Sequence, residues 1–273
     1  MDEKIFKYYE KGEEAVRLSE GTDRVEFERT KEILLRYLPP PPAKILDVGG
    51  GAGAYSFWLA EKSYTVHLID IVPLHVEQAK TAYGAALIAS IGEGDARKLN
   101  FESDSMDVVL LLGPLYHFPR RSDRIRALKE TRRVLKTGGL VFCAAISRFA
   151  SLLGGLAQDF LSDPEFRKIA LKDVKDGNHL NPQEIPGYFT SAYFHRPEEL
   201  AAEIQEAGLS HLSTLGLEGS SWLLGDFEER WADPARKEII LEVLRLIEDE
   251  KTLLGVSAHL LAVAKNEIRT EAI

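Results

Sequence analysis

Three aspartates are the residues of this chain that are best placed to bind a ligand, because each stands at the end of an apolar run. Asp47 precedes a glycine-rich turn at 49–53, Asp70 ends a second run, and Asp95 follows a third. Glycine is needed where the backbone takes φ > 0 or where a ligand presses against the main chain. Asp47 faces an ammonium better than a pyrophosphate, Asp70 suits ribose hydroxyls, and Asp95 suits an adenine amino group. The spacing predicts a cofactor cradle at the start of a helix.

The same turn also fits a second kind of cofactor site. Gly49, Gly51 and Ala54 have the spacing of the dinucleotide fingerprint, and an acid at Asp70 would hold the ribose of that cofactor. However, no arginine or lysine lies in the glycine turn to help hold phosphates. An NAD(P)-dependent oxidoreductase is therefore the alternative, and the remaining acids favour a different cofactor.

Apolar strand-like runs alternate with helix-like runs from residue 44 onward, and these elements must position the acids. The expected strands are 44–48, 64–69, 86–91, 107–112 and 139–146, and the expected helices are 54–62, 74–83 and 121–135. This alternation predicts a mostly parallel sheet covered by helices on both faces. Ligands bind beyond the carboxyl ends of the strands in such sheets, which is where the aspartates stand.

The chain divides into four segments. Residues 1–43 are expected to form an N-terminal helical cap ending at four prolines, and 44–146 the cofactor-binding core. The aromatic-rich stretch 147–196 is too long for an ordinary connection, so we interpret it as a partly helical lid over the substrate. Residues 197–273 return to the core sheet and its helices. They are expected to hold a helix from 197, strands at 209–217 and 256–265, and one helix at 226–250.

Composition limits the partners of the protein. The 273 residues carry a formal net charge of −9, which opposes binding to nucleic acid because phosphates require Lys and Arg. Cys143 is the single cysteine and cannot form an internal disulfide. No apolar stretch approaches the ~18 residues of a membrane span, and the N-terminus shows no apolar signal region. We expect a cytoplasmic protein without nucleic-acid or membrane partners.

The order of these motifs resembles the class I S-adenosylmethionine-dependent methyltransferases. The segments that carry the resemblance are 47–53, 67–71, 94–96, 107–113 and 136–140. The resemblance implies an α/β, Rossmann-like fold with a seven-stranded, mostly parallel sheet, helices on both faces and a helical, aromatic lid insertion. It also implies S-adenosyl-L-methionine as cofactor, S-adenosyl-L-homocysteine as product, and a last antiparallel strand in the sheet.

The resemblance also implies a set of cofactor-binding residues. The glycine turn would let the backbone approach the methionine part, Asp47 would hold the ammonium, and Asp70 the ribose diol. Ile71 would pack on the adenine, while Asp95 and the backbone of Ala96 would bind its edge. Carbonyls near Leu112 and Gly113 would complete the ammonium site, and Tyr9 would fold over the cofactor. The expected set is Tyr9, Asp47, Gly49, Gly51, Gly53, Asp70, Ile71, Asp95, Ala96, Leu112 and Gly113.

The methyl acceptor is expected beyond the fourth strand, at 113–118. Methyl transfer is an in-line displacement, so a base is needed only for a hydroxyl or a protonated amine. Gly113 and Leu115 replace the side chains that grip an exocyclic amine in some relatives, which counts against adenine methylation. His117 is the candidate base. The expected acceptor-binding residues are Tyr116, His179, Tyr188, Tyr193 and His195, and no histidine has the tight spacing of a metal site.

The leading interpretation is a methyltransferase that transfers a methyl group from S-adenosylmethionine to a small-molecule acceptor by in-line displacement. An NAD(P)-dependent oxidoreductase is one alternative. A non-catalytic S-adenosylmethionine-binding protein, with a closed acceptor pocket, is another. The sequence names neither the acceptor nor the methylated atom, and it does not give the oligomeric state.

Overall fold

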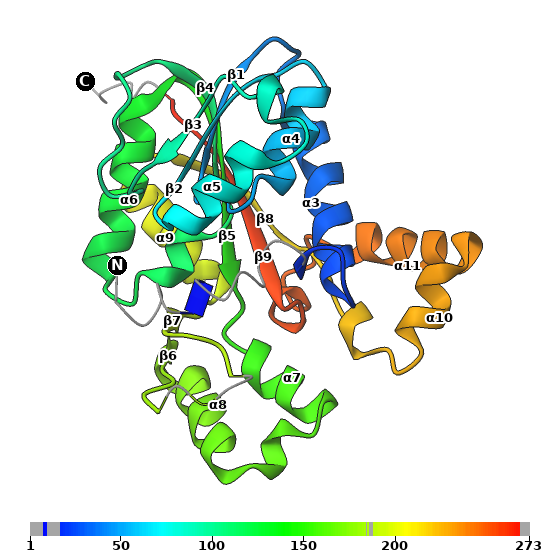
Figure 1. The fold of residues 1–273 in the computed structure, drawn as a ribbon. Helices are drawn as coiled ribbons and strands as arrows, with labels where there is room; N and C mark the ends of the chain where they lie inside the picture. The colour runs from blue at the N-terminus through cyan, green and yellow to red at the C-terminus, as the bar shows by residue number, and fades with distance from the viewer. Residues whose placement is uncertain (1–7, 10–16, 184, 186–187, 268–273) are drawn as a thin grey trace.

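A single seven-stranded sheet organises the chain (Figure 1). The computed structural model describes residues 8–9, 17–183, 185 and 188–267. The strands follow the order β3-β2-β1-β4-β5-β9-β8, in which β9 runs antiparallel to both of its neighbours. The bounds are β1 Lys44–Val48, β2 Thr65–Asp70, β3 Ser90–Glu93, β4 Met106–Leu111, β5 Leu135–Ile146, β8 Ser210–Gly216 and β9 His259–Lys265. This confirms the predicted fold class.

Helices cover both faces because side chains alternate along each buried strand. On β4, Val109 faces a core that includes Leu128 and Ile204, whereas Val108 faces a core that includes Ile33 and Leu59. The first face is covered by α6 Arg121–Val134 and α9 Pro197–Glu206. The second is covered by α3 Asp23–Tyr37, α4 Ala54–Glu61 and α5 Pro73–Thr81. Each strand of the sheet centre is therefore apolar on both sides.

Several predicted elements differ in their bounds: the strand expected at 139–146 begins at Leu135, and the strand expected at 256–265 begins at His259. Two further elements are wrong in other respects. The expected helix 226–250 is split into α10 Phe227–Ala232 and α11 Pro234–Ile247, which lie beyond α3 in Figure 1. Proline cannot continue a helix, and the Asp233 carboxylate accepts the Ala235 and Arg236 amides to cap the new one. The expected strand 86–91 begins only at Ser90, because a short 3₁₀ turn occupies Ala85–Leu87.

The segment 147–196 forms a small subdomain beyond the carboxyl end of β5 (Figure 1). It contains α7 Ala150–Ala157, α8 Pro164–Asp176 and a two-stranded ribbon of β6 Asn178–His179 and β7 Ala192–Tyr193. Phe194 and Ala192 pack against Ile146 and Tyr116, so the subdomain rests on the loop that follows β4. Its proposed role as an acceptor lid remains a prediction.

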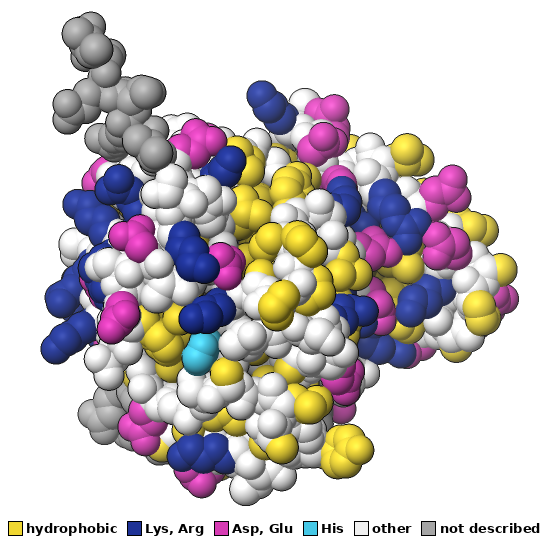
Figure 2. Space-filling view, turned by 90° about the horizontal axis from the view of Figure 1, so that it is seen from above, with side chains coloured by type: hydrophobic (Ala, Val, Ile, Leu, Met, Phe, Trp, Pro, Cys, Tyr) yellow, Lys and Arg dark blue, Asp and Glu magenta, His cyan; other side chains and the backbone are white. Residues whose placement is uncertain are grey.

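The surface mixes both signs of charge. The face in Figure 2 carries Lys and Arg beside Asp and Glu, around an apolar area in the middle. No helix among the described residues is long and apolar enough to cross a membrane. Most of the expected N-terminal cap before α3 lies outside the described residues. Within it, Tyr8 and Tyr9 are described and pack against Val72 and Ile71.

Candidate active site

A cavity of about 390 Å³ opens at the carboxyl ends of β1, β2 and β4. It is lined by four stretches of the core, at 47–52, 70–72, 94–96 and 112–114, together with side chains of the N-terminal segment. These stretches are the ones that the sequence singles out. Three aspartates and the glycine turn therefore meet at one edge of the sheet, where α/β proteins bind their ligands.

In the glycine turn between β1 and α4, backbone without side chains lines this cavity. Gly49 has φ +72° and Gly51 has φ +57°, a left-handed conformation that other residues rarely adopt. A Cβ at Gly49 would lie 2.7 Å from Cγ of Pro114. Gly53, with φ +99°, stands at the N-cap of α4. Glycine is thus required here both for the turn and for its contact with the loop after β4.

Asp70 lies at the end of β2 and is almost fully buried. Its Oδ2 accepts the Gly51 amide at 2.9 Å, and its Oδ1 accepts the Val72 amide at 2.8 Å. Nδ1 of His75 lies 3.3 Å from Oδ1. The carboxylate is therefore held at a fixed place beside the glycine turn, with lone pairs left for a ligand.

Asp47 is buried beneath the same turn, where its Oδ2 accepts a 2.7 Å hydrogen bond from the Ser56 hydroxyl. Burial raises the pKa of Asp47 to about 6, and the neighbouring charge of Asp70 acts in the same direction, although the Ser56 bond opposes it. A carboxylate held in this way gains from a cationic partner, because a nearby positive charge stabilises its ionised form.

Asp95 lines the cavity but already has a protein partner. Arg97 donates to it from the backbone amide at 2.8 Å and from Nη2 at 2.6 Å. Although burial opposes ionisation, these bonds hold the pKa of Asp95 below its usual range. An adenine amino group at this position would share the carboxylate with Arg97. Ile71 and Ala96 line the cavity beside it.

The loop after β4 forms the other wall of the cavity, with Leu112 and Gly113 at its start. The side chains of Tyr116 and His117 follow, and both are buried. The hydroxyl of Tyr9 lies 2.6 Å from Nε2 of His117. Burial lowers the pKa of His117 to about 3, so the imidazole is neutral at physiological pH. The structure thus places Tyr9 against the candidate base.

The structure brings only one of the five expected acceptor-binding residues, Tyr116, to the cavity. Each of the others has partners elsewhere. His179 is hydrogen-bonded to Asp173 and stacks on Phe194. The hydroxyl of Tyr188 donates to Asp163, Tyr193 lies under Arg124, and His195 is buried beside Glu203. The aromatic content of 147–196 therefore serves mainly to pack the subdomain.

Several cavity residues were missed in the sequence, and His75 and Arg17 are two of them. His75 lines the wall behind Asp70, and its position near the start of a helix five residues after that acid is a signal that was available. Arg17 also lines the cavity, and it is the only arginine or lysine among the described lining residues. Nothing in the local sequence connects it with the glycine turn, because the contact depends on how the N-terminal segment folds back.

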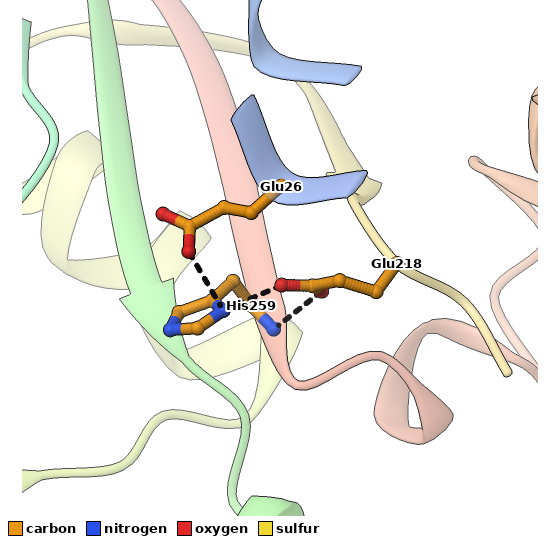
Figure 3. A group of neighbouring side chains, drawn as sticks. All are labelled: Glu26, Glu218 and His259. Atoms are coloured by element: carbon orange, nitrogen blue, oxygen red, sulfur yellow. Dashed lines mark hydrogen bonds and ion pairs between the residues drawn. The ribbon is translucent and has the colours of Figure 1, made fainter. Parts of the chain in front are cut away.

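A second group of side chains lies behind Arg17. Glu26 of α3, Glu218 after β8 and His259 at the start of β9 each offer an atom within 4.8 Å of the others, which is close enough to consider a metal ion (Figure 3). The three residues are far apart in the chain, so close histidine spacing in the sequence does not reveal them.

Comparison with known proteins identifies the family. Residues 46–143 match the model of a methyltransferase domain. A demethylmenaquinone methyltransferase of Bacillus velezensis is 32% identical over 181 residues, which cover 62% of this chain and 72% of that protein. The chain belongs to the class I S-adenosylmethionine-dependent methyltransferases. It is an enzyme that transfers a methyl group from S-adenosylmethionine to a small-molecule acceptor, and the oxidoreductase alternative falls away.

Other relatives of this methyltransferase agree. A 2-methyl-6-phytyl-1,4-hydroquinone methyltransferase of Oryza sativa is 30% identical over 145 residues, 48% of this chain and 40% of that protein. A solved protein of Pyrococcus horikoshii has a TM-score of 0.61 at 17% identity, covering 95% of this chain and 98% of its own. A solved methyltransferase of Methanosarcina mazei has a TM-score of 0.58 at 21% identity, covering 87% and 98%. The two structures support the fold.

Proposed function

We propose that this methyltransferase binds S-adenosylmethionine along the cavity between Asp95 and Asp47, and that it methylates a planar, hydroxylated ring beside Tyr9 and His117. The observation that carries the proposal is the continuity of the cavity. One hollow is lined by Asp95, by Asp70 and the glycine turn, and by the Tyr9–His117 pair.

The cofactor half of the cavity has groups for each part of S-adenosylmethionine. Ile71 and Ala96 offer apolar contact to the adenine, and Asp70 has free lone pairs for the ribose hydroxyls. Asp47 offers a buried carboxylate to the ammonium, supported by carbonyls at Leu112 and Gly113. When bound, S-adenosylmethionine supplies a methyl group already activated by its sulfonium.

The acceptor half is aromatic. Tyr9, Tyr116, His117 and Phe118 line it, and the ring of Phe189 lies 5.8 Å from that of His117. Such walls favour a flat apolar ring, because aromatic faces and edges pack on one another. The relatives from Bacillus velezensis and Oryza sativa are named for a demethylmenaquinone and a hydroquinone. A hydroquinone-like ring, methylated on carbon next to a hydroxyl, fits both observations.

The Tyr9–His117 pair has a role in this chemistry. Neutral His117 has one nitrogen without a proton, and Nε2 at 2.6 Å from the Tyr9 hydroxyl is placed to accept its hydrogen. A ring hydroxyl of the acceptor that donates to Tyr9 would share its proton with this pair, because an imidazole whose pKa is about 3 is too weak a base to hold that proton alone. Partial loss of the proton raises electron density on the adjacent ring carbons, one of which would receive the methyl group as the bond to the sulfonium breaks. That carbon then loses its own proton, which restores the aromatic ring. Such proton transfer contributes typically 10²–10⁴-fold to a rate.

Kinetics with a dihydroxylated aromatic ring as acceptor test the proposal. His117→Gln and Tyr9→Phe should each lower kcat by about 10²-fold while leaving the affinity for S-adenosylhomocysteine nearly unchanged. Tyr64→Phe is the matched control, since the Tyr64 hydroxyl donates to the Pro39 carbonyl away from the cavity. Unchanged kcat in both cavity variants would contradict a role in proton transfer.

A further inference from the structure

Phe189 of the subdomain 147–196 contacts the candidate base. Its ring lies 5.8 Å from that of His117, with the two planes 32° apart. The same ring lies 5.5 Å from that of Tyr8 and 6.4 Å from that of Tyr116. However, Phe189 is not among the residues that line the cavity. It therefore contacts the base without forming part of the wall that faces the acceptor.

The chemistry proposed for His117 depends on the direction in which its ring points. Nε2 must face the Tyr9 hydroxyl, which lies 2.6 Å away. Rotation of a histidine ring about its Cβ–Cγ bond has only a broad preference, so the neighbouring side chains decide where Nε2 points. Those neighbours include the rings of Tyr9, Tyr116 and Phe189. Phe189 is the one of these three that the subdomain supplies.

Phe189 is in turn held by His179 of β6. Nε2 of His179 lies 3.3 Å from the carbonyl oxygen of Phe189, and the two rings lie 6.0 Å apart. Nδ1 of His179 lies 2.7 Å from Oδ2 of Asp173, which belongs to α8. The imidazole also stacks on Phe194 at 4.8 Å, with the planes 8° apart. His179 therefore ties the backbone at Phe189 to two other parts of the subdomain.

The polar pair of Asp173 and His179 is costly for a small core. Both side chains are buried, and Oδ1 of Asp173 has no hydrogen-bond partner among the described residues. Buried polar groups lower stability unless they are hydrogen-bonded, so apolar side chains would fill this space at less cost. Hydrogen bonds are directional, however, and a bonded polar network fixes one arrangement of its members. The pair can thus fix the position of Phe189, which apolar packing alone does less well.

We propose that Phe189 is a positioning residue that orients the imidazole of His117, and that Asp173 and His179 hold Phe189 in place for this purpose. The inference rests on the proposed role of the Tyr9–His117 pair and adds the group that orients it. The subdomain thus acts on methyl transfer through the base, by a chain of contacts that starts at α8 and ends at the imidazole.

Steady-state kinetics with a dihydroxylated aromatic ring distinguish orientation of the base from binding of the acceptor. Phe189→Ala should lower kcat by about tenfold, less than loss of His117 itself, and leave the KM of the acceptor unchanged, because a misplaced base slows only the chemical step. Phe160→Ala is the matched control, since Phe160 packs on Phe166 and Tyr188 in the same subdomain. It should change neither constant. A raised KM at unchanged kcat in Phe189→Ala makes Phe189 an acceptor-binding residue and overturns the proposal.

A double-mutant cycle tests the part played by Asp173 and His179. His179→Phe keeps an aromatic ring against Phe194 but loses both nitrogens, and Asp173→Asn is made with it so that no carboxylate is left buried and unpaired. Together they should lower kcat several-fold in the wild type and have no further effect in Phe189→Ala, since they act only through Phe189. Destabilisation of the subdomain alone would lower the melting temperature equally in both backgrounds. Fully additive effects on kcat overturn this part of the proposal.

Nitrogen NMR spectra of the histidine-labelled protein without ligands measure the orientation of His117 independently of any acceptor. The wild-type Nε2 resonance, assigned with His117→Gln, should be that of an unprotonated nitrogen that accepts a hydrogen bond. Phe189→Ala should move it toward an unbonded nitrogen, as Tyr9→Phe does, whereas Phe160→Ala should not. An unmoved resonance in Phe189→Ala overturns the proposal. If the resonance moves as expected but the wild type methylates no hydroxylated ring, the proposed acceptor is wrong and the positioning of His117 stands.

Discussion

The backbone amide of Gly51 lies 2.9 Å from Oδ2 of Asp70, so the glycine turn after β1 is hydrogen-bonded to the acid that ends β2. Gly51 follows β1 and Asp70 ends β2, and these two strands are parallel neighbours in which Val48 pairs with Ile69. This bond fixes the distance between the surfaces proposed for the methionine and ribose parts. The conformation of the turn and the position of the acid therefore act together on cofactor binding.

Gly51→Val should abolish measurable cofactor binding. Valine is strained at φ +57°, and its branched side chain would occupy the approach to the cavity. Gly138→Val is the matched control, because Gly138 has φ +83° with open space around its Cβ and lies in the first part of β5. Calorimetry with S-adenosylhomocysteine should find loss of binding in the first variant only. Normal binding by a folded Gly51→Val protein would place the ligand elsewhere.

Asp47 should link cofactor affinity to pH. Its pKa of about 6 lies above the unfolded value of 3.8, so it is partly protonated in the free enzyme below pH 6. An ammonium ligand requires the ionised form, hence affinity for S-adenosylmethionine should fall as the pH decreases through 6. The same titration measured on Asp47→Asn should be weak and nearly flat between pH 5 and about 7. A wild-type affinity independent of pH would remove Asp47 from the ammonium site.

The same aspartate should lower stability at neutral pH. A pKa raised on folding contributes stability that is present below pH 3.8 and lost as the pH rises through about 6. Asp47→Asn should therefore raise the free energy of unfolding at pH 7 by on the order of 2 kcal/mol while weakening cofactor binding. Denaturant melts at pH 7 and pH 4 measure this, and a variant that is less stable at pH 7 contradicts it.

The contribution of His259 to the stability of the fold should depend on pH in the alkaline range. Burial disfavours its charge, but Glu26 and Glu218 raise its pKa to about 9, above the ordinary 6.5. Its contribution to stability is therefore complete below pH 6.5 and is lost as the pH rises through about 9. The stability difference between wild type and His259→Gln should shrink over this interval in urea melts. A constant difference would mean that His259 is neutral in the folded enzyme.

The sequence predicts the core of this fold well because the determinants are local. The apolar run 44–48, the turn 49–53 and the acid Asp70 all lie within about one strand–helix unit. Hydrophobic periodicity and the glycines of the turn therefore locate them in the sequence. The break at Asp233–Pro234 was equally local, since proline at a helix start was readable, but the apolar periodicity on both sides obscured it.

The rest of the site depends on contacts between distant segments. Tyr9 meets His117 across 108 positions, and Arg17 reaches the cavity only because α3 holds it through Glu26. The aromatic residues of 147–196 show another limit of sequence reasoning. Their number predicts an acceptor lid, which stays a prediction, and in the structure several of them pack within the subdomain, as Phe166 does on Tyr188, whereas Phe189 lies beside His117. Composition alone does not distinguish a binding wall from a small core.

Calorimetric titration of the wild type and Asp70→Ala with S-adenosylhomocysteine tests the central claim most directly. Asp70 would accept two ribose hydrogen bonds, each worth about 1.5–3 kcal/mol for a charged acceptor. The wild type should bind, and Asp70→Ala should bind at least roughly tenfold more weakly with its fold intact. Asp107→Ala, at the amino end of β4 where Asp107 pairs with Lys136, should match the wild type. Equal affinity of wild type and Asp70→Ala would contradict cofactor binding in this cavity.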